Sequence, residues 1–436
     1  MDSNRRWLML GIGMCAQLAS CVFLYGLAYL VPVLREDEGM SLAQAGTVVA
    51  CPTFGLLLTL VLWGAAADRW GERAVMATGL ALAGGAIAMA LVGDGTVWLG
   101  AWLAVAGACS AAVNAASGRV VLGWFAPEQR GLAMGMRQMA QPLGMVAGAL
   151  VLPPIGTQAG FRAALVFPAV LCVFGAILVA LIVRDPVRPI PVAGAERPAS
   201  PYASPVLYRI HTASALLVVS QFVVVSFAAD YLVAEHGWTA TAAGRLLAGV
   251  QLVAAGSRIA VGRWSDVVGS RLGPMRVLCA VNAVVVGGLA LTAAIGGPAA
   301  IVLLLLASVA TVSWNGLAFT AVAEIAGSAW AGRVMGIQNT GQNLTAAAGP
   351  PLFGAIIGGP GGYVTAYALC AVIPVVAGFL TPRQEGASPR ASRNAMASDP
   401  PSSTSTPKAN RSSASPEVSA SPSDVNVGKR AGGNDA

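Results

Sequence analysis

The stretch Gly64-Ala-Ala-Ala-Asp68-Arg69-Trp-Gly71-Glu-Arg73 lies between two apolar runs and points to the fold of the whole chain. A second version, Gly262-Arg-Trp-Ser-Asp266-Val-Val-Gly269-Ser-Arg271, follows 198 residues later. A chain that uses one glycine, aspartate and arginine element twice is expected to consist of two copies of one half. Other positions repeat in the same order at an offset of 201: Asn114 with Asn315, Gln141 with Gln342 and Gly148 with Gly349.

The composition indicates a membrane protein. Hydrophobic residues make up 56% of the chain, charged residues only 10%, and the mean hydropathy is +0.70. The charged fraction of an ordinary soluble domain is about 25%. A bilayer core about 30 Å thick needs about 20 helical residues for each crossing. Twelve apolar runs of that order predict spanning helices at 7–30, 43–66, 74–93, 96–118, 131–153, 163–183, 211–234, 241–262, 276–296, 298–321, 333–357 and 363–380.

The apolar runs are continuous and rich in Leu, Ala and Gly, which favours helices over the short alternating segments of a β-barrel. The expected fold class is therefore an all-α membrane protein. Four parts are predicted along the chain: an N-terminal six-helix bundle (1–184), a Pro-rich cytoplasmic linker (185–209), a C-terminal six-helix bundle (210–380) and a disordered, Ser- and Pro-rich cytoplasmic tail (381–436).

The repeated pattern G-x-x-x-D-[R]-x-G-x-R, placed at the end of a second helix, resembles the signature loop of the major facilitator superfamily of transporters. The resemblance covers residues 1–380 and implies twelve transmembrane helices in two pseudo-symmetric six-helix bundles. A shorter segment, residues 124–138, looks like bacterial members grouped with cyanate and small organic-acid permeases. The resemblance also implies a protein that acts as a monomer on a small solute within the lipid bilayer.

The arginines follow the pattern expected of membrane topology. The formal net charge of +7 could suggest nucleic acid, but the arginines concentrate in alternate loops. By the positive-inside rule these loops face the cytoplasm. We therefore expect a multi-pass plasma-membrane protein with both termini cytoplasmic and no nucleic-acid partner. The arginines on the cytoplasmic side would be Arg5, Arg6, Arg69, Arg73, Arg130, Arg333 and those within 184–209 and 263–276.

The chain carries no recognisable catalytic or metal-binding set. Its seven cysteines lie within apolar runs without C-x-x-C spacing, and its two histidines have no accompanying motif. An enzyme, a metal site and an organic cofactor are therefore not expected.

In the family that the loops resemble, the acid caps or pairs with a neighbouring helix end, and the arginines hold cytoplasmic loops together in the outward-facing state. The alternative is that these residues merely fix topology. The second copy has Val267 where Arg69 stands in the first, so its ion-pair network should be weaker. The candidate gating residues are Gly64, Asp68, Arg69, Gly71, Arg73, Gly262, Asp266, Gly269 and Arg271.

Arg137 is the most informative single charge. A fifth helix starting near Gly131 would place it about 9 Å into the membrane, where charges usually face an aqueous cavity or a partner. Alternatively its long side chain could snorkel to the interface. Arg119 and Arg258 lie nearer helix ends, so we expect them to snorkel or contact loops.

Several amides could share a central site with Arg137. Guanidinium and amide groups donate hydrogen bonds suited to carboxylates and other oxyanions. Interhelical hydrogen bonding is the competing interpretation for the amides. The substrate-binding candidates are Arg137, Gln138, Gln141, Asn114, Asn315, Gln338 and Gln342.

Two acids, Asp230 and Glu324, are candidates for proton coupling, although neither is expected at the middle of its helix. The favoured function is secondary active transport of a small solute, an organic anion, by alternating access. The alternatives are proton-coupled efflux of drugs or other hydrophobic compounds and, in a different class, a membrane sensor that no longer transports. The first helix carries no acid, and the fifth departs from the glycine-rich element of drug exporters, so drug export is less favoured.

Overall fold

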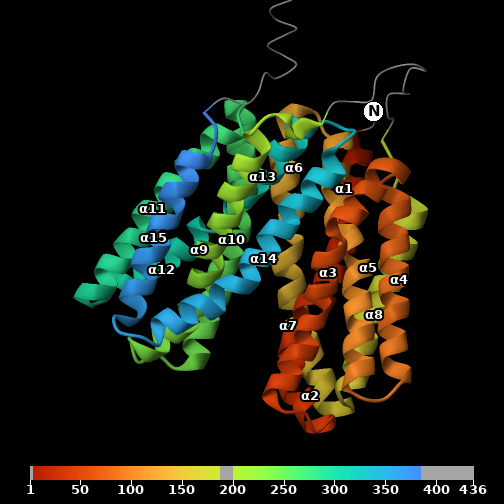
Figure 1. The fold of residues 1–436 in the computed structure, drawn as a ribbon, viewed down its shortest axis with the longest axis horizontal. Coiled ribbons are helices and arrows are strands. Elements are labelled where there is room, and N and C mark those ends of the chain that lie inside the picture. The colour runs from red at the N-terminus through yellow and green to blue at the C-terminus, as the bar shows by residue number, and fades with distance from the viewer. Residues whose placement is uncertain (1–2, 187–199, 384–436) are drawn as a thin grey trace, which may run out of the picture. The chain divides into compact units, whose positions relative to one another are not determined.

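The computed structural model describes residues 3–186 and 200–383, which belong to one compact unit that is entirely helical in the described ranges (Figure 1). The helices of the N-terminal half are α1 (Ser3–Gly26), η1 (Leu27–Leu30), α2 (Val31–Asp37), α3 (Leu42–Trp70), α4 (Glu72–Val92), α5 (Thr96–Trp124), α6 (Pro127–Gln138), α7 (Ala140–Ala159) and α8 (Phe161–Ile182). Those that follow are η2 (Pro201–Ala203), α9 (Val206–Ala234), α10 (Ala240–Val268), α11 (Leu272–Ile295), α12 (Ala299–Ala310), α13 (Asn315–Ala326), α14 (Ala331–Ile357) and α15 (Gly362–Leu380).

Matching signals begin and end α3 and α10, the two helices that carry the repeated loop. The Ser41 hydroxyl accepts the N–H of Gln44, whose side chain accepts the N–H of Ser41 in return. At the start of α10 the Thr239 hydroxyl accepts the N–H of Ala242, whose methyl side chain cannot return the bond. Gly71 and Gly269 end the helices with φ of 97° and 70°, a conformation that favours glycine. The two copies of the repeat therefore resemble each other in how their helices begin and end, as well as in sequence.

Ten helical segments in the described part of the chain are long and apolar enough to cross a membrane, and two expected spans fall short. These two are α10 and α14, predicted at 241–262 and 333–357. They are more polar because α10 carries Arg258 and α14 carries Gln338 and Gln342 toward the centre of the fold. The twelve-helix arrangement in two six-helix bundles holds, and α10 and α14 both pack against helices of the other half.

Two predicted spans, 131–153 and 298–321, are each broken into two helices rather than continuous. The first breaks at Met139, between α6 and α7. Pro142 has no N–H for the carbonyl of Gln138 four residues earlier. The freed carbonyl accepts a hydrogen bond of 2.6 Å from Arg258 in the other half. The second break separates α12 from α13, and Arg258 also donates to the Val312 carbonyl there at 3.2 Å.

The two halves meet closely at one end of the unit, where four glycines allow backbone contact. A methyl group on Gly64 would lie 2.3 Å from the Gly332 carbonyl oxygen, and one on Gly131 would lie 2.3 Å from that of Gly262. These are two pseudo-symmetric crossings, α3 with α14 and α6 with α10. We call this the motif end, because Asp68 and Asp266 lie beside the crossings.

The halves separate toward the opposite end. A methyl group on Gly46 of α3 or on Gly244 of α10 would meet nothing within 4 Å. The ribbons of the two halves also diverge in that direction in Figure 1. The structure is therefore the conformation in which the motif end is closed.

The predicted linker and tail are described only in part. Residues 187–199 and 384–436 lie outside the described residues. Within the expected linker range, α9 already begins at Val206, which is earlier than the predicted boundary at 210.

Candidate functional site

A small polar pocket lies between the two halves, where α1, α5, α6 and α7 face α9, α13 and α14. Its cavity volume is about 40 Å³. Nine of its lining side chains are amides, and one is an arginine. The pocket is lined by Gln17, Tyr25, Asn114, Arg137, Gln138, Gln141, Val218, Gln221, Phe222, Asn315, Phe319, Asn339, Gln342, Asn343 and Ala346.

Arg137 forms the charged wall of this pocket. Its side chain is buried, so it does not snorkel to the interface. The guanidinium donates to the Ser117 hydroxyl at 2.8 Å and 3.0 Å and to Gln138 Oε1 at 2.6 Å. It also donates to the Asn114 carbonyl at 3.0 Å, and it lies 5.7 Å from the centre of the Phe319 ring. In the described residues no carboxylate pairs with it, so neutral dipoles alone solvate the cation.

Gln17 organises the N-terminal wall around this cation. Its Oε1 accepts from Ser117 at 3.0 Å and from Arg137 at 3.3 Å, while its Nε2 donates to Asn114 Oδ1 at 2.8 Å. The Asn114 Nδ2 is buried and has no hydrogen-bond partner. An unused donor beside an unneutralised guanidinium is an arrangement that suits an incoming anion.

The C-terminal wall is built from amides. Gln342 donates to Asn315 Oδ1 at 3.0 Å, and Asn339 reaches across to the Asn114 carbonyl at 3.4 Å. The Gln221 Oε1 is buried without a partner. The two halves thus contribute different chemistry, a cation from one and neutral amides from the other.

Gln338, the symmetry partner of Arg137, does not line the pocket. Its Oε1 is in short contact with His211 Nδ1, and the other ring nitrogen of that histidine lies 3.0 Å from the Tyr202 hydroxyl. The structure therefore brings together six of the seven predicted substrate-binding side chains: Arg137, Gln138, Gln141, Asn114, Asn315 and Gln342.

At the motif end, Asp68 joins α3 to the first turn of α14. Its carboxylate accepts the N–H groups of Gly332 at 2.8 Å and Arg333 at 3.1 Å, near the positive end of the helix dipole. Arg119 forms a close ion pair with Asp68 and a second, of 2.7 Å, with Glu72. A helix of the C-terminal half is thus capped by an acid of the N-terminal half.

Asp266 makes the symmetric contact between α10 and α6. It accepts the N–H groups of Gly131 at 2.9 Å and Leu132 at 2.8 Å, and it pairs with Arg271 at 2.6 Å. Arg271 also pairs with Glu324 at 3.2 Å. Burial disfavours the charge on Arg271, but Glu324 and Asp266 raise the pKa of its guanidinium above the ordinary value.

The second network is not weaker than the first, contrary to the expectation drawn from Val267. The reason is that Arg69 forms no ion pair among the described residues; it lies 5.8 Å from the ring of its neighbour Trp70. Arg73 likewise stays within its own half, where it donates to the Ala180 carbonyl and its N–H donates to Asp185. The arginines that pair with acids are Arg271, which was among the predicted gating residues, and Arg119, which was not.

Arg119 and Arg258 do not snorkel, so that part of the expectation was wrong, but Arg119 does contact a loop, at the Ser328 carbonyl between α13 and α14. Both are buried, with 5% and 6% exposure. Each guanidinium has partners inside the fold that stabilise its burial. Arg119 pairs with two acids, and Arg258 donates to two backbone carbonyls at the helix breaks. Both therefore bind helices of the N- and C-terminal halves together, since Arg119 also donates to the Ser328 carbonyl at 3.0 Å.

The two proton-coupling candidates lie outside the central pocket. Asp230 is exposed and accepts a short hydrogen bond from Tyr363. Glu324 belongs to the motif-end network, with Arg271 at 3.2 Å and Arg130 at 3.5 Å. Among the described side chains, no group of His, Cys, Asp and Glu residues could hold a metal ion.

Four pocket amides were not singled out from the sequence: Gln17, Gln221, Asn339 and Asn343. Each lies inside a long helix, where an unpaired amide is costly in lipid. Asn339 and Asn343 are also one helical turn apart on α14 and are linked by a 2.9 Å hydrogen bond. Their position as amides inside apolar runs is the sequence feature that could have identified them as pocket residues.

Comparison with known proteins agrees with this architecture. Residues 13–350 match the profile of the Major Facilitator Superfamily. An uncharacterized MFS-type transporter of Mycobacterium tuberculosis (strain ATCC 25618 / H37Rv) is 44% identical over 379 residues, which cover 86% of this chain and 85% of the relative. The glycerol-3-phosphate transporter of Bacillus subtilis (strain 168) is 25% identical over 163 residues, 36% of each chain. The crystal structure of a human organic anion transporter has the same fold, with a TM-score of 0.70, 17% identity and coverage of 88% of this chain and 100% of that one.

Proposed function

The chain belongs to the major facilitator superfamily of membrane transporters, and we propose that it moves a small organic anion through the central pocket by alternating access. It is not an enzyme. The observation that carries the choice of substrate is the buried guanidinium of Arg137, which faces the pocket and has no carboxylate partner in the described ranges.

A buried cation in this position destabilises the fold unless a negative charge neutralises it. An isolated buried charge costs several kcal/mol, and neutral hydrogen bonds recover only part of that cost. A carboxylate or phosphate ester that docks against Arg137, in place of one of these neutral acceptors, would supply the missing charge. The free Asn114 amide would add a further donor. The partial relative that carries glycerol 3-phosphate also moves an anion.

The chemistry of the pocket disfavours large hydrophobic compounds. Pockets for drug-sized ligands are usually lined mainly by apolar groups. Most of the side chains that line this pocket are amides. Polar walls of this kind hydrogen-bond a small hydrophilic solute and would be left unsatisfied by an apolar one.

The motif-end networks supply the gate. In our proposal the motif end and both termini face the cytoplasm of a cell whose plasma membrane holds the protein as a monomer. The Asp68 and Asp266 networks then hold the inner side closed while the pocket opens outward. Coupling protons would be carried outside the pocket, with Asp230 as the exposed candidate and Glu324 held in ion pairs.

The first test is thermal unfolding of the detergent-purified full chain against small carboxylates, sugar acids, glycerol phosphates, cyanate and lipophilic cations. A ligand at 100 times its Kd stabilises the folded state by about 2.7 kcal/mol. We expect an anion to raise the Tm and Arg137→Ala to abolish the rise. A charge-assisted hydrogen bond contributes about 1.5–3 kcal/mol, so the affinity should fall about tenfold or more.

Arg137→Lys keeps the charge and loses the planar set of guanidinium donors, so the anion should still raise the Tm of this variant, but by less. Arg263→Ala, which removes an exposed arginine of α10, should retain all of it. Stabilisation by lipophilic cations alone would overturn the proposal in favour of efflux. Ligand binding without any uptake into proteoliposomes would favour a sensor.

A further inference from the structure

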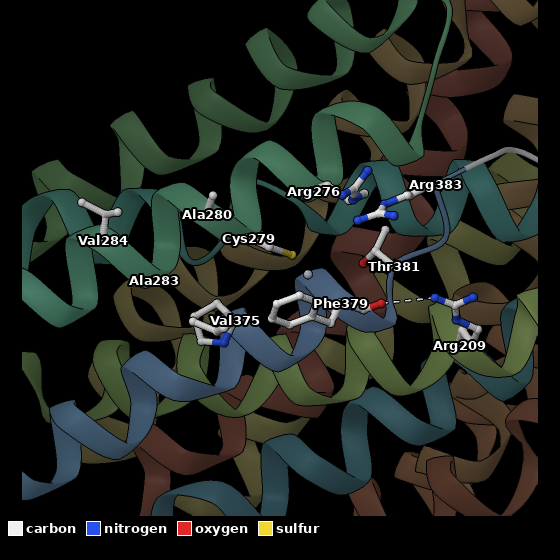
Figure 2. Close-up of a pocket in the computed structure, with 12 residues that line it drawn as sticks. Arg209, Arg276, Cys279, Ala280, Ala283, Val284, Val375, Phe379, Thr381 and Arg383 are labelled. Carbon is white, nitrogen blue, oxygen red and sulfur yellow. Dashed lines mark hydrogen bonds between the residues drawn. The ribbon is translucent and has the colours of Figure 1, made fainter.

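A second cavity lies far from the central pocket, in a groove between α11 and α15 beside the start of α9 (Figure 2). Its volume is about 720 Å³. The two helices approach closely where Gly378 meets Cys279, since a methyl group on this glycine would lie 3.3 Å from the Cys279 Cβ. Small residues, Ala280 and Ala283, leave the groove open beyond that contact.

One end of the groove is strongly basic. Arg209, Arg276 and Arg383 all line it, and Figure 2 shows them gathered at the same end. Arg209 donates to the carbonyls of Phe379 at 3.1 Å and Leu380 at 2.9 Å, which leaves other N–H groups of its guanidinium free. Within the described part of the chain, Arg276 and Arg383 have neither an ion pair nor a hydrogen bond. No acid is among the lining residues, so the positive charge is unbalanced.

The other end of the groove is apolar and open. Val284 is 75% exposed and Val375 is 44% exposed, and Phe379, which is 78% exposed, lies between this end and the arginines (Figure 2). Both α11 and α15 are apolar enough to cross a membrane, so this face meets lipid chains. The basic end lies where these helices reach the motif end, at the edge of the apolar region.

The corresponding helix pair of the N-terminal half, α4 and α8, differs in the charge at this end. Arg73 of α4 donates to the Ala180 carbonyl of α8, and Asp185 accepts the backbone N–H of the same arginine. An acid therefore lies beside the arginine of this helix pair, whereas no acid is among the residues that line the groove between α11 and α15.

We propose that this groove binds an anionic phospholipid, with the phosphate held by Arg209, Arg276 and Arg383 and an acyl chain lying along Ala283, Val284 and Val375. Charge complementarity selects the occupant. A basic pocket between transmembrane helices at the membrane surface is the arrangement that binds acidic headgroups. The apolar groove that continues from it into the bilayer matches a chain attached to that headgroup, whereas a soluble anion would leave the groove uncovered.

The test measures lipid binding to the purified full chain by native mass spectrometry. Dioleoyl phosphatidylglycerol is compared with dioleoyl phosphatidylcholine, which has the same chains and no net charge. Each surface arginine should contribute about fivefold to the affinity for an acidic lipid. We expect phosphatidylglycerol to bind the wild type preferentially, Arg276→Ala to bind it about fivefold less tightly, and the Arg276→Ala/Arg383→Ala double variant about thirtyfold less tightly.

Two controls separate this site from general charge and folding effects. Arg5→Ala/Arg263→Ala removes two exposed arginines elsewhere and should bind like the wild type. Ala283→Phe fills the groove without changing charge and should weaken binding, while an unchanged Tm without lipid shows that each variant is folded. Equal binding of both lipids, equal loss in the two double variants, or full displacement of the lipid by soluble glycerol phosphate would each overturn the proposal.

Discussion

Asp68 and Asp266 each bind two backbone N–H groups of the opposite half; Asp68 also pairs with Arg119 and Arg333, and Asp266 pairs with Arg271. An asparagine can keep one N–H contact and loses the charge, which removes about 1.5–3 kcal/mol for each charge-assisted bond. We expect Asp68→Asn to lower the initial rate of anion uptake into proteoliposomes about tenfold or more, because the motif end no longer closes firmly. Asp94→Asn, at a side chain that is 96% exposed, should leave the rate within about twofold. Equal rates in the two variants would contradict a gating role.

For single residues, the sequence identified the charged side chains of the site but not the residues that they bind. Asp68 and Asp266 were identified from the repeated loop, and Arg137 was identified from its depth in the helix. The partners escaped prediction because they come from remote segments: Arg119 lies 51 residues from Asp68, and the N–H groups that Asp68 binds lie 264 and 265 residues away. Gln338 was wrongly predicted to line the pocket. It occupies the position that corresponds to Arg137 in the other half, but its side chain contacts His211.

Among the helices, the length of the apolar runs predicted the twelve-helix arrangement but not the breaks within two of the runs. A run of apolar residues does not reveal that Pro142 frees the Gln138 carbonyl, nor that Arg258 satisfies it from another helix. The break therefore depends on a tertiary contact, and the same arginine also bonds at the second break. A single side chain thus connects the α6–α7 break of the N-terminal half with the α12–α13 break of the C-terminal half.

The helix crossings at the motif end lead to a separate prediction. A methyl group on Gly262 would lie 2.2 Å from the Gly131 carbonyl oxygen, and backbone cannot move aside cheaply. We expect Gly262→Ala to keep the motif end from closing and to reduce uptake about tenfold or more. Gly256→Ala changes the same helix at a site where the new methyl group meets nothing within 4 Å. It should transport normally, and a comparable loss of uptake in this variant would refute the steric explanation.

Across the whole molecule, the contacts between halves are concentrated on one side of the central pocket. Both acid networks and both glycine crossings lie at the motif end, while Gly46 and Gly244, at the far ends of the same two helices, have no neighbour for an added methyl group. In the proposed alternating-access cycle, the motif end would open and the opposite end would close. The motif-end crossings would then separate as the far ends of α3 and α10 approach the other half.

Spin-label distances can test this exchange directly. In a background without the seven native cysteines, one label pair replaces Trp70 and Val268 at the motif end, and a second replaces Val92 and Ile295 at the opposite end; all four positions are well exposed. On addition of the transported anion, we expect the first distance to lengthen in a fraction of molecules and the second to shorten in the same fraction. With Gly262→Ala, the first distance should already be long without substrate. If both distances changed in the same direction, the halves would be separating as a whole, and the pocket would not be a site of alternating access.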